Sequence, residues 1–473
     1  MKTYYFILTF FIFSKLSIAQ DLKAKAMEEL NKKEAFYGSL EKQIWGYAEV
    51  GYQEIKSSAL LQDQLKKEGF RIQTGVADIP TAFTATFGEG KPVIAILGEF
   101  DALPGLSQDT IPEKKPIGGI AGHACGHHLF GVGSMASAIA LKNWLIGSGQ
   151  KGTIRFYGTP AEEGGSGKVY MVRAGLFNDV DVVLHWHPGD RNNANAASSL
   201  ANKSAKFRFR GISAHAAGAP DRGRSALDGV EVMDYAVNMM REHVPSATRI
   251  HYVITDGGKA PNVVPDFAEV YYYVRHPTRD YVKSIWERVQ KAAQGAAMAT
   301  GTTVEEEIIG GVHELLPNEV LGRMMHANLQ KIGGYKMTAT EVAFAEKIMK
   351  TQGMADSETA ATEKIDPFSD ERAGGGSTDV GDISWVVPTA SCRTATWVPG
   401  TPAHSWQAVA AGGTSFGRKG MMIAAKTITS TAIDLFLNPQ AIIDAKAEFI
   451  KRRGNYKYEA LLGDRKPALN YRD

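Results

Sequence analysis

The stretch GHACGHH, residues 122–128, concentrates residue types that bind metal ions. It holds three of the chain's 12 histidines and one of its 2 cysteines. Cys125 and His127 stand two residues apart, so a thiolate and an imidazole can reach one face of a turn, and both are good zinc ligands. The neighbouring glycines let the backbone approach closely. A buried cysteine beside helix-capping histidines is the alternative that this stretch alone leaves open.

Two adjacent carboxylates, Glu162 and Glu163, occur in the segment TPAEEGGSG. Held together they repel each other, so they favour a bound cation or a shared proton. One of them could bind a metal while the other acts as a general base. For a glutamate pair taken alone, a solvated charged turn is the simpler interpretation.

Three further histidines stand close to glycine and proline. His185 and His187 belong to the segment DVVLHWHPG, and His404 follows a proline-containing turn in GTPAHSW. We expect His185 and His187 to point to opposite sides of a strand, so that only one of them faces the site. A lone histidine such as His404 is more often structural than a ligand. Taken together with the cysteine and the glutamates, these residues are enough to bind two metal ions.

The elements that must position these residues alternate between strands and helices. Apolar runs predict buried strands at Val93–Leu97 and Thr153–Tyr157, and a third strand that ends in His185 and His187. The segment Leu129–Leu145 predicts a helix. This alternation favours an α/β domain with a mostly parallel sheet. The polar residues gather at the carboxyl ends of the strands, where open α/β sheets bind their ligands.

From about Ala205 the pattern changes to the order βαββαβ, which is a ferredoxin-like unit. Gly-rich segments with polar ends resume downstream of it. We therefore predict a discontinuous metal-binding domain, residues 20–203 and 312–473, with an inserted domain at residues 204–311. Part of the charged segment 343–376 is expected to form a long surface loop. The charged tail after residue 438 is expected to pack as an appendage.

Length, charge and the N-terminal residues bound the possible functions. A chain of 473 residues favours two domains, and its net charge of +2 argues against binding to nucleic acid or an anionic membrane. Residues 1–19 combine Lys2, a short apolar run and small residues in the order typical of a secretory signal peptide. We expect an exported, soluble protein, periplasmic or extracellular, in which no later segment spans a membrane. An uncleaved N-terminal anchor is the alternative.

Export raises a second possibility for the cysteines. In an oxidising compartment Cys125 and Cys392 could form a disulfide. The histidines that flank Cys125 favour a metal site instead, because a structural disulfide needs no such neighbours.

Six motifs of this chain occur in the order seen in a known enzyme family. They are GEFDALPG, GHACGHHLFG, PAEEGG, GISAHAAGAP, PNVVPDFAEVYYYVR and GTPAHSW. The chain resembles the dinuclear-metal amidohydrolases of the aminoacylase and peptidase type, which include the hippurate, indoleacetyl-amino-acid and p-aminobenzoyl-glutamate hydrolases. It is most similar to the p-aminobenzoyl-glutamate hydrolases of the B-type chain, over about residues 25–440. The resemblance implies two metal ions in the catalytic domain and a lid domain that dimerises.

The resemblance also implies roles for single residues. Cys125 resembles the bridging metal ligand and Glu162 the general base. The remaining metal ligands implied by the family are His127, Glu163, His187 and His404. The family places its ligand six residues after a strand aspartate, here Asp181, and this spacing selects His187 over His185.

Residues of the lid complete the implied site. His215 resembles a lid histidine that enters the active site of the neighbouring subunit. Asn262 and Arg275 resemble groups that hold the carboxylate of the substrate. Behind the metals, Asp101 resembles a carboxylate that supports the ligand His127.

Two positions depart from the patterns of the relatives. Glu99 stands where more distant carboxypeptidases have a metal-binding histidine, a role that His127 takes here. His128 stands where the family often has Asp or Asn. This difference could alter a hydrogen-bond acceptor that supports the metal ligands.

The sequence thus predicts a metal-dependent amidase. Thiolate and imidazole ligands favour zinc, with manganese or cobalt as alternatives. Because Arg275 and Asn262 would hold a free carboxylate, we expect N-acyl amino acids or dipeptides as substrates, cleaved by a homodimer. A dipeptidase with the same site is one alternative. A non-catalytic metal-binding or ligand-binding protein is the other, and the presence of Glu162 argues against it.

Overall fold

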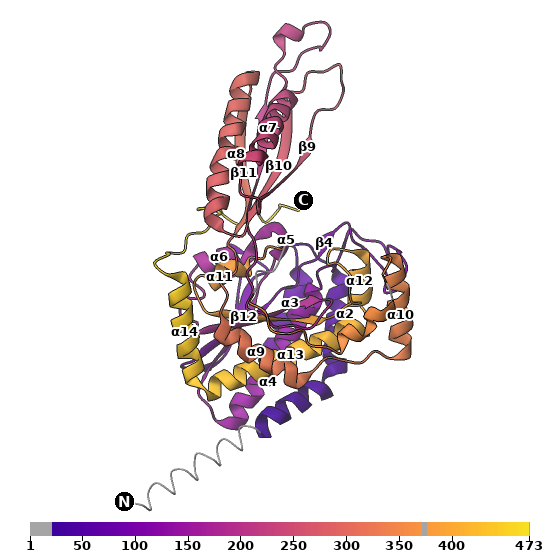
Figure 1. The fold of residues 1–473 in the computed structure, drawn as a ribbon, viewed down its shortest axis with the longest axis vertical. Helices are drawn as coiled ribbons and strands as arrows, with labels where there is room; N and C mark the ends of the chain where they lie inside the picture. The colour runs from indigo at the N-terminus through magenta and orange to yellow at the C-terminus, as the bar shows by residue number, and fades with distance from the viewer. Residues whose placement is uncertain (1–20, 355, 371–375, 473) are drawn as a thin grey trace, which may run out of the picture.

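The computed structural model describes residues 21–354, 356–370 and 376–472. The predicted signal peptide, residues 1–19, lies outside the described residues. Figure 1 shows a broad α/β domain from which a narrower domain projects.

A six-stranded sheet forms the centre of the larger domain. Its strands, in spatial order, are β1 (Arg71–Thr74), β2 (Phe83–Glu89), β6 (Gly152–Gly158), β3 (Val93–Gly98), β7 (Val182–Gly189) and β12 (Thr389–Ala395). The last four strands of this order run parallel, whereas β2 pairs antiparallel with β1 and β6. The prediction of a mostly parallel α/β sheet is confirmed. The parallel strands bring their carboxyl ends to one edge.

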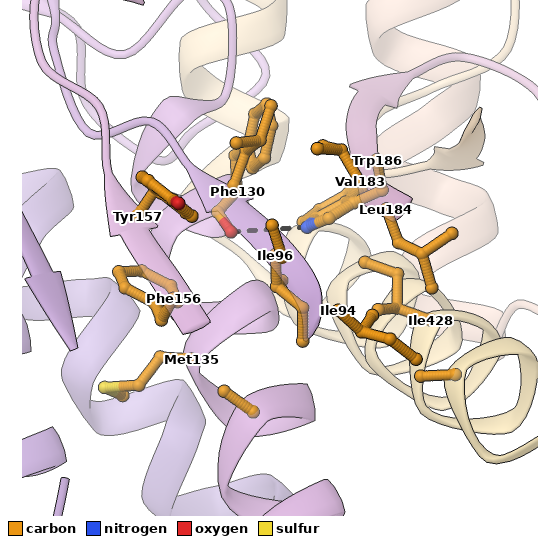
Figure 2. Packing of buried hydrophobic residues seen from close by; sticks show 14 of the residues in the cluster. Ile94, Ile96, Phe130, Met135, Phe156, Tyr157, Val183, Leu184, Trp186 and Ile428 are labelled. Carbon is orange, nitrogen blue, oxygen red and sulfur yellow. Dashed lines mark hydrogen bonds between the residues drawn. The ribbon is translucent and has the colours of Figure 1, made fainter. Parts of the chain in front are cut away.

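Two long helices, α4 (His127–Ser148) and α13 (Ser415–Leu437), pack against this sheet. Figure 2 shows the resulting core, in which Ile94 and Ile96 of β3 lie among buried side chains of the neighbouring elements. Both helices are long and apolar enough to cross a membrane, and 89% and 83% of their apolar windows are buried inside the protein. Helices of a large core can be as apolar as membrane spans, so this result leaves the expectation that no later segment spans a membrane as a prediction.

The projecting domain has the predicted order βαββαβ. Its elements are β8 (Ala201–Arg210), α7 (Ala226–Met240), β9 (Arg249–Asp256), β10 (Phe267–His276), α8 (Arg279–Thr300) and β11 (Thr303–Val312). The strands lie in the order β11-β8-β10-β9 and pair antiparallel throughout, as in a ferredoxin-like fold. α7 and α8 cover one face of the sheet and form a separate hydrophobic core with it (Figure 1).

The remaining elements surround the main sheet. The longer ones are α2 (Glu34–Tyr47), α3 (Ile55–Lys67), α9 (Glu319–Ile332), α10 (Ala339–Thr351) and α14 (Pro439–Arg453). α10 begins at a capping box formed by Thr338 and Glu341, so the segment predicted as a long loop is helical as far as Thr351. After α14 the chain returns to the junction of the two domains, where its C-terminal end lies (Figure 1).

The core of the projecting domain gives a test of its stability. Trp286 of α8 is 2% exposed, packs against Phe207 and donates its Nε1–H to Glu306 at 2.7 Å. We predict that Trp286→Ala lowers the free energy of unfolding of this domain by about 3–5 kcal/mol, since it leaves a cavity and removes the hydrogen bond to Glu306. Met298→Ala, on the same helix at 84% exposure, should change it by less than about 0.5 kcal/mol. Urea unfolding followed by hydrogen exchange measures both values, and equal effects would contradict this packing.

Candidate metal centre and active site

The carboxyl edge of the main sheet carries the predicted site. β3 ends directly before Glu99, β6 ends four residues before Glu162, and β7 carries His187 near its end. A cavity of about 1040 Å³ opens at this edge. Its lining includes the predicted residues Cys125, Glu162, Glu163, His187, Arg275 and His404.

Two groups of candidate ligands share one cysteine, and a third group, Glu99, His127 and Glu162, contains no cysteine. The first group is Cys125, His127 and His187, and the second is Cys125, Glu163 and His404. Within each group the ligand atoms lie within 4.8 Å of one another. Two cations bound at these groups would therefore have the Cys125 sulfur between them, which is the position of a bridging ligand. Cys125 and Cys392 are both free, so the alternative disulfide is not formed.

Asp101 orients the buried ligand His127. Its Oδ1 lies 2.9 Å from His127 Nδ1, so the other ring nitrogen, Nε2, is left for a metal. That Nε2 atom is buried and lies 3.1 Å from Glu99 Oε2, a contact that does not have the geometry of a hydrogen bond. The second oxygen of Asp101 accepts the backbone N–H of Glu163 at 2.9 Å. Asp101 thus supports candidate ligands from two segments of the chain.

The turn that carries the two glutamates is sharply bent. Ala161 has φ +56°, a left-handed conformation, and its N–H donates to the buried Glu54 at 2.8 Å. Glu162 and Glu163 follow this bend and both line the cavity. Burial and the neighbouring charge of Glu163 raise the pKa of Glu162 well above its ordinary value. A nearby cation would counteract both causes and favour the ionised form that a general base requires.

His404 meets Glu163 across the cavity. Its Nε2 lies 3.1 Å from the buried Oε1 of Glu163. Hydrogen bonding to Cys125 and Glu163 raises the pKa of His404 to about 10. The surroundings of His404 therefore favour positive charge. Sulfur, nitrogen and oxygen donors with unsatisfied lone pairs, set in a negative environment, fit divalent metal ions.

A buried lysine, absent from the predicted site, lies beside the glutamates. Lys168 is fully buried, and its Nζ lies 2.7 Å from both Glu99 and Asp379. Burial alone would lower the pKa of Lys168, but the carboxylates of Asp379 and Glu99 raise it and keep the lysine charged. Asp379 follows Lys168 by more than 200 positions, so no local sequence pattern indicates this pair.

The expectation for the two strand histidines was wrong. Residues two apart on a strand lie on the same face, so His185 and His187 both line the cavity, while Trp186 between them points into the core (Figure 2). His187 Nε2 lies 3.5 Å from Cys125 Sγ, whereas His185 belongs to neither ligand group. Burial lowers the pKa of His185 to about 3, so its imidazole is neutral.

His128 makes its contacts away from the candidate metal ligands. Its Nε2 lies 3.1 Å from the carbonyl oxygen of Gly412 and 3.7 Å from Glu41, on buried parts of other helices. Because His127 and His128 are neighbours at the start of a helix, their side chains point in different directions. His128 therefore contributes to packing between helices.

The three lid residues fall into two sets. Arg275, at the end of β10, lines the cavity, and its Nε is buried without a hydrogen-bond partner among the described residues. His215 and Asn262 lie outside the cavity, and both are exposed. His215 Nδ1 accepts the backbone N–H groups of Ala217 and Gly218 at 3.2 and 3.0 Å, which orients the ring.

Comparisons with known proteins agree with this geometry. Residues 201–300 match the peptidase dimerisation domain of the M20 family. The chain is 42% identical to the B chain of p-aminobenzoyl-glutamate hydrolase from Escherichia coli (strain K12), over 87% of this chain and 91% of that protein. It is 28% identical to the Xaa-Arg dipeptidase of Mus musculus, over 90% of this chain and 92% of that protein.

A solved structure shares the fold. It is a dinuclear metal-binding peptidase of the M20 family from Bacillus subtilis, with a TM-score of 0.56, 18% identity and coverage of 86% of this chain and 99% of that chain. The identity to the Escherichia coli hydrolase extends over nearly the whole chain, and the projecting domain matches the family's dimerisation domain. This protein therefore belongs to the M20 family of dinuclear-metal peptidases and amidohydrolases.

Proposed function

We propose that this protein hydrolyses the amide bond of N-acyl amino acids, with substrates that resemble p-aminobenzoyl-glutamate. The observation that carries the proposal is one cavity in which two ligand groups share Cys125 and in which Glu162 stands beside them. Two divalent cations at these groups would supply Lewis acidity, which activates water and polarises the amide carbonyl. The thiolate and imidazole donors favour zinc, and manganese or cobalt are the alternatives. We place the reaction outside the cytoplasm, on the basis of the predicted leader at residues 1–19.

Different side chains of the protein would have different roles in the reaction. Glu162 takes a proton from the attacking water and later passes it to the nitrogen of the leaving amine. Asp101 keeps His127 and Glu163 in place through its two hydrogen bonds. Arg275 binds the free carboxylate of the substrate through a charge-assisted pair. We propose that His215 and Asn262 act in the site of the other subunit of a homodimer, because both lie outside the cavity of their own.

Dipeptide hydrolysis is the second candidate function. It is supported by the similarity to a dipeptidase, and a dipeptide also presents an amide bond close to a free carboxylate. Assays of the metal-loaded protein with p-aminobenzoyl-glutamate, N-acetyl amino acids and dipeptides would separate the two candidates. Turnover of none of these substrates by protein that holds its metals would contradict both candidates and indicate a binding protein.

The first prediction concerns the bridging sulfur. Elemental analysis should find about two metal ions per chain in the wild type and fewer in Cys125→Ser, because the shared ligand is lost from both groups. The matched control is Cys392→Ser, since Cys392 is buried in β12 outside both groups and its replacement should leave the metal content unchanged. Full metal retention in Cys125→Ser would contradict the bridging role.

The second prediction concerns the base. Glu162→Gln keeps the shape of the side chain but removes the proton acceptor. Its metal content should stay near that of the wild type while kcat falls by at least ~10²-fold, the usual scale for a positioned general base. A variant that keeps most of the wild-type rate would show that another group accepts the proton.

The third prediction concerns sharing of the site between subunits. Homodimers of Glu162→Gln and of His215→Ala should both be nearly inactive. In a mixed dimer, the subunit with Glu162 receives the intact His215 of its partner, which gives one working site. After random exchange, activity should recover to about a quarter of the wild-type value, as expected for a symmetric dimer.

One control variant and one contradicting outcome complete this test. His243→Ala, at another histidine on the surface of the lid, should leave activity unchanged. Absence of recovery after demonstrated exchange of subunits would show that His215 does not act across the dimer.

A further inference from the structure

The C-terminal tail, residues 454–472, is attached to both domains at their junction. The Arg465 guanidinium donates to the carbonyl oxygen of Ile309 at 2.9 Å and pairs with Glu307 at 2.9 Å, and both partners belong to β11 of the lid. The carbonyl oxygens of Arg465 and Lys466 accept hydrogen bonds from Arg173 and Tyr170 of the catalytic domain. These bonds direct the end of the chain toward the cavity, at the position marked C in Figure 1.

Tyr471 holds the tail against the turn that carries the glutamates. Its hydroxyl donates to the carbonyl oxygen of Glu163 at 2.9 Å, and its ring packs edge-on against Tyr52 at 5.6 Å between centroids. Gly51 leaves the space for this contact, because a Cβ at that position would lie 2.3 Å from the Tyr471 hydroxyl. The tail therefore packs into space that the absence of a side chain at Gly51 leaves open.

Arg472 is the residue that this arrangement brings into the cavity. One of its terminal nitrogens donates to the carbonyl oxygen of Glu163, and the side chain lines the cavity. Its Nε is buried and has no hydrogen-bond partner among the residues that the structure describes. The guanidinium thus keeps donor capacity for a further acceptor.

Arg472 and Arg275 both lie near Tyr273 on the cavity wall. A Cβ on Gly164 would lie 3.7 Å from the Tyr273 hydroxyl and 3.8 Å from Arg472 Nη2, so these two groups approach the same point. The Arg275 guanidinium lies 5.4 Å from the centroid of the Tyr273 ring. Two arginines from distant parts of the chain therefore flank one tyrosine on the cavity wall.

Neither guanidinium forms an ion pair with a described carboxylate. Three acidic groups of the cavity have other partners: Glu163 contacts His404, while Glu99 and Asp379 contact Lys168. Unpaired guanidiniums that are partly desolvated favour planar anions such as carboxylates. Two of them match a ligand that carries two carboxylates.

We propose that Arg472 is a specificity-determining residue that binds the side-chain carboxylate of an N-acylated acidic amino acid, while Arg275 binds its α-carboxylate. This inference rests on the proposed function and adds to it the selection of acidic over neutral amino acids. A third cavity arginine, Arg393, lies beside His187 in the register of β12 and β7 and is exposed. Arg472 suits the role better, because its contact with Glu163 already restricts the side chain and less entropy is lost on binding.

The test compares p-aminobenzoyl-L-glutamate with p-aminobenzoyl-L-glutamine, which differ only in the charged end of the side chain. The wild type should prefer the glutamate substrate in kcat/KM. Arg472→Gln should reduce this preference by roughly 10-fold to 100-fold, the range for a lost charge-assisted bond, through KM more than kcat. Arg472→Lys should keep part of the preference because it keeps the charge.

Two matched variants locate the effect. Arg275→Gln should weaken both substrates by similar factors, since both carry the α-carboxylate, and Arg393→Gln should leave the preference unchanged. If Arg393→Gln removes the preference, or if Arg472→Gln lowers kcat/KM equally for both substrates, the proposal is overturned. Unchanged metal content in Arg472→Gln would exclude collapse of the Glu163 turn as the cause of any loss.

Binding measurements separate this inference from the proposed function. Calorimetric titration of metal-loaded Glu162→Gln with the two compounds needs no turnover. Weaker binding of the glutamate compound after Arg472→Gln is added would support the carboxylate site even if the wild type cleaved neither compound. Identical affinities with and without Arg472 would refute the site even if the wild type were an active amidase.

Discussion

Asp101 uses both oxygens of its carboxylate inside the metal centre, one at 2.9 Å from His127 Nδ1 and the other at 2.9 Å from the backbone nitrogen of Glu163. Asp101 follows β3 and Glu163 follows β6, and these two strands are parallel neighbours. The pairing of the strands therefore sets the distance that Asp101 bridges. Asp101 thus holds both the ring of His127 and the turn that carries Glu163 and the base. The site therefore depends on the register of the sheet.

The same edge of the sheet gathers an unusual amount of negative charge. Glu99, Glu162, Glu163 and Asp379 line one cavity together with the Cys125 sulfur. Buried carboxylates are costly unless they are paired. The ammonium group of Lys168 offsets the charge of two of them, Glu99 and Asp379. Burial and repulsion from the neighbouring carboxylates raise the pKa of Glu162. Bound cations would offset this negative charge and stabilise the arrangement.

The parts of the site that the sequence predicts are those with a local pattern. Cys125, His127 and the glutamate pair stand within short motifs, and the structure brings them together at strand ends as expected. The fold class also follows from local patterns, because alternating apolar runs and helices specify a parallel sheet and the order βαββαβ specifies the lid. The error at His185 and His187 came from the geometry of a strand, in which residues two apart share a face.

Residues whose role depends on distant segments gave no such signal. Lys168 meets Asp379 through a contact between segments more than 200 positions apart, and Arg472 reaches the cavity only because the tail is bound to β11 and to the Glu163 turn. A charged tail of this kind has no periodicity that distinguishes it from a solvated end. Tertiary packing alone decides these contacts.

The reacting groups and the groups proposed to select the substrate come from different parts of the fold. His187 lies on the main sheet, and Glu162 and Glu163 follow β6 of that sheet, so its hydrogen bonds constrain their spacing. Cys125 and His127 follow β5 (Ala121–Gly122) of a separate two-stranded sheet. Arg275 and Tyr273 come from a strand of the lid, and Arg472 comes from the tail. Substitutions in the lid can change the cavity wall without moving the sheet edge, because the lid takes no part in the main sheet. The tail also contacts the turn that carries Glu163. The reacting groups are thus constrained by strand pairing, whereas the groups that face the rest of the substrate are held by side-chain contacts that are easier to alter.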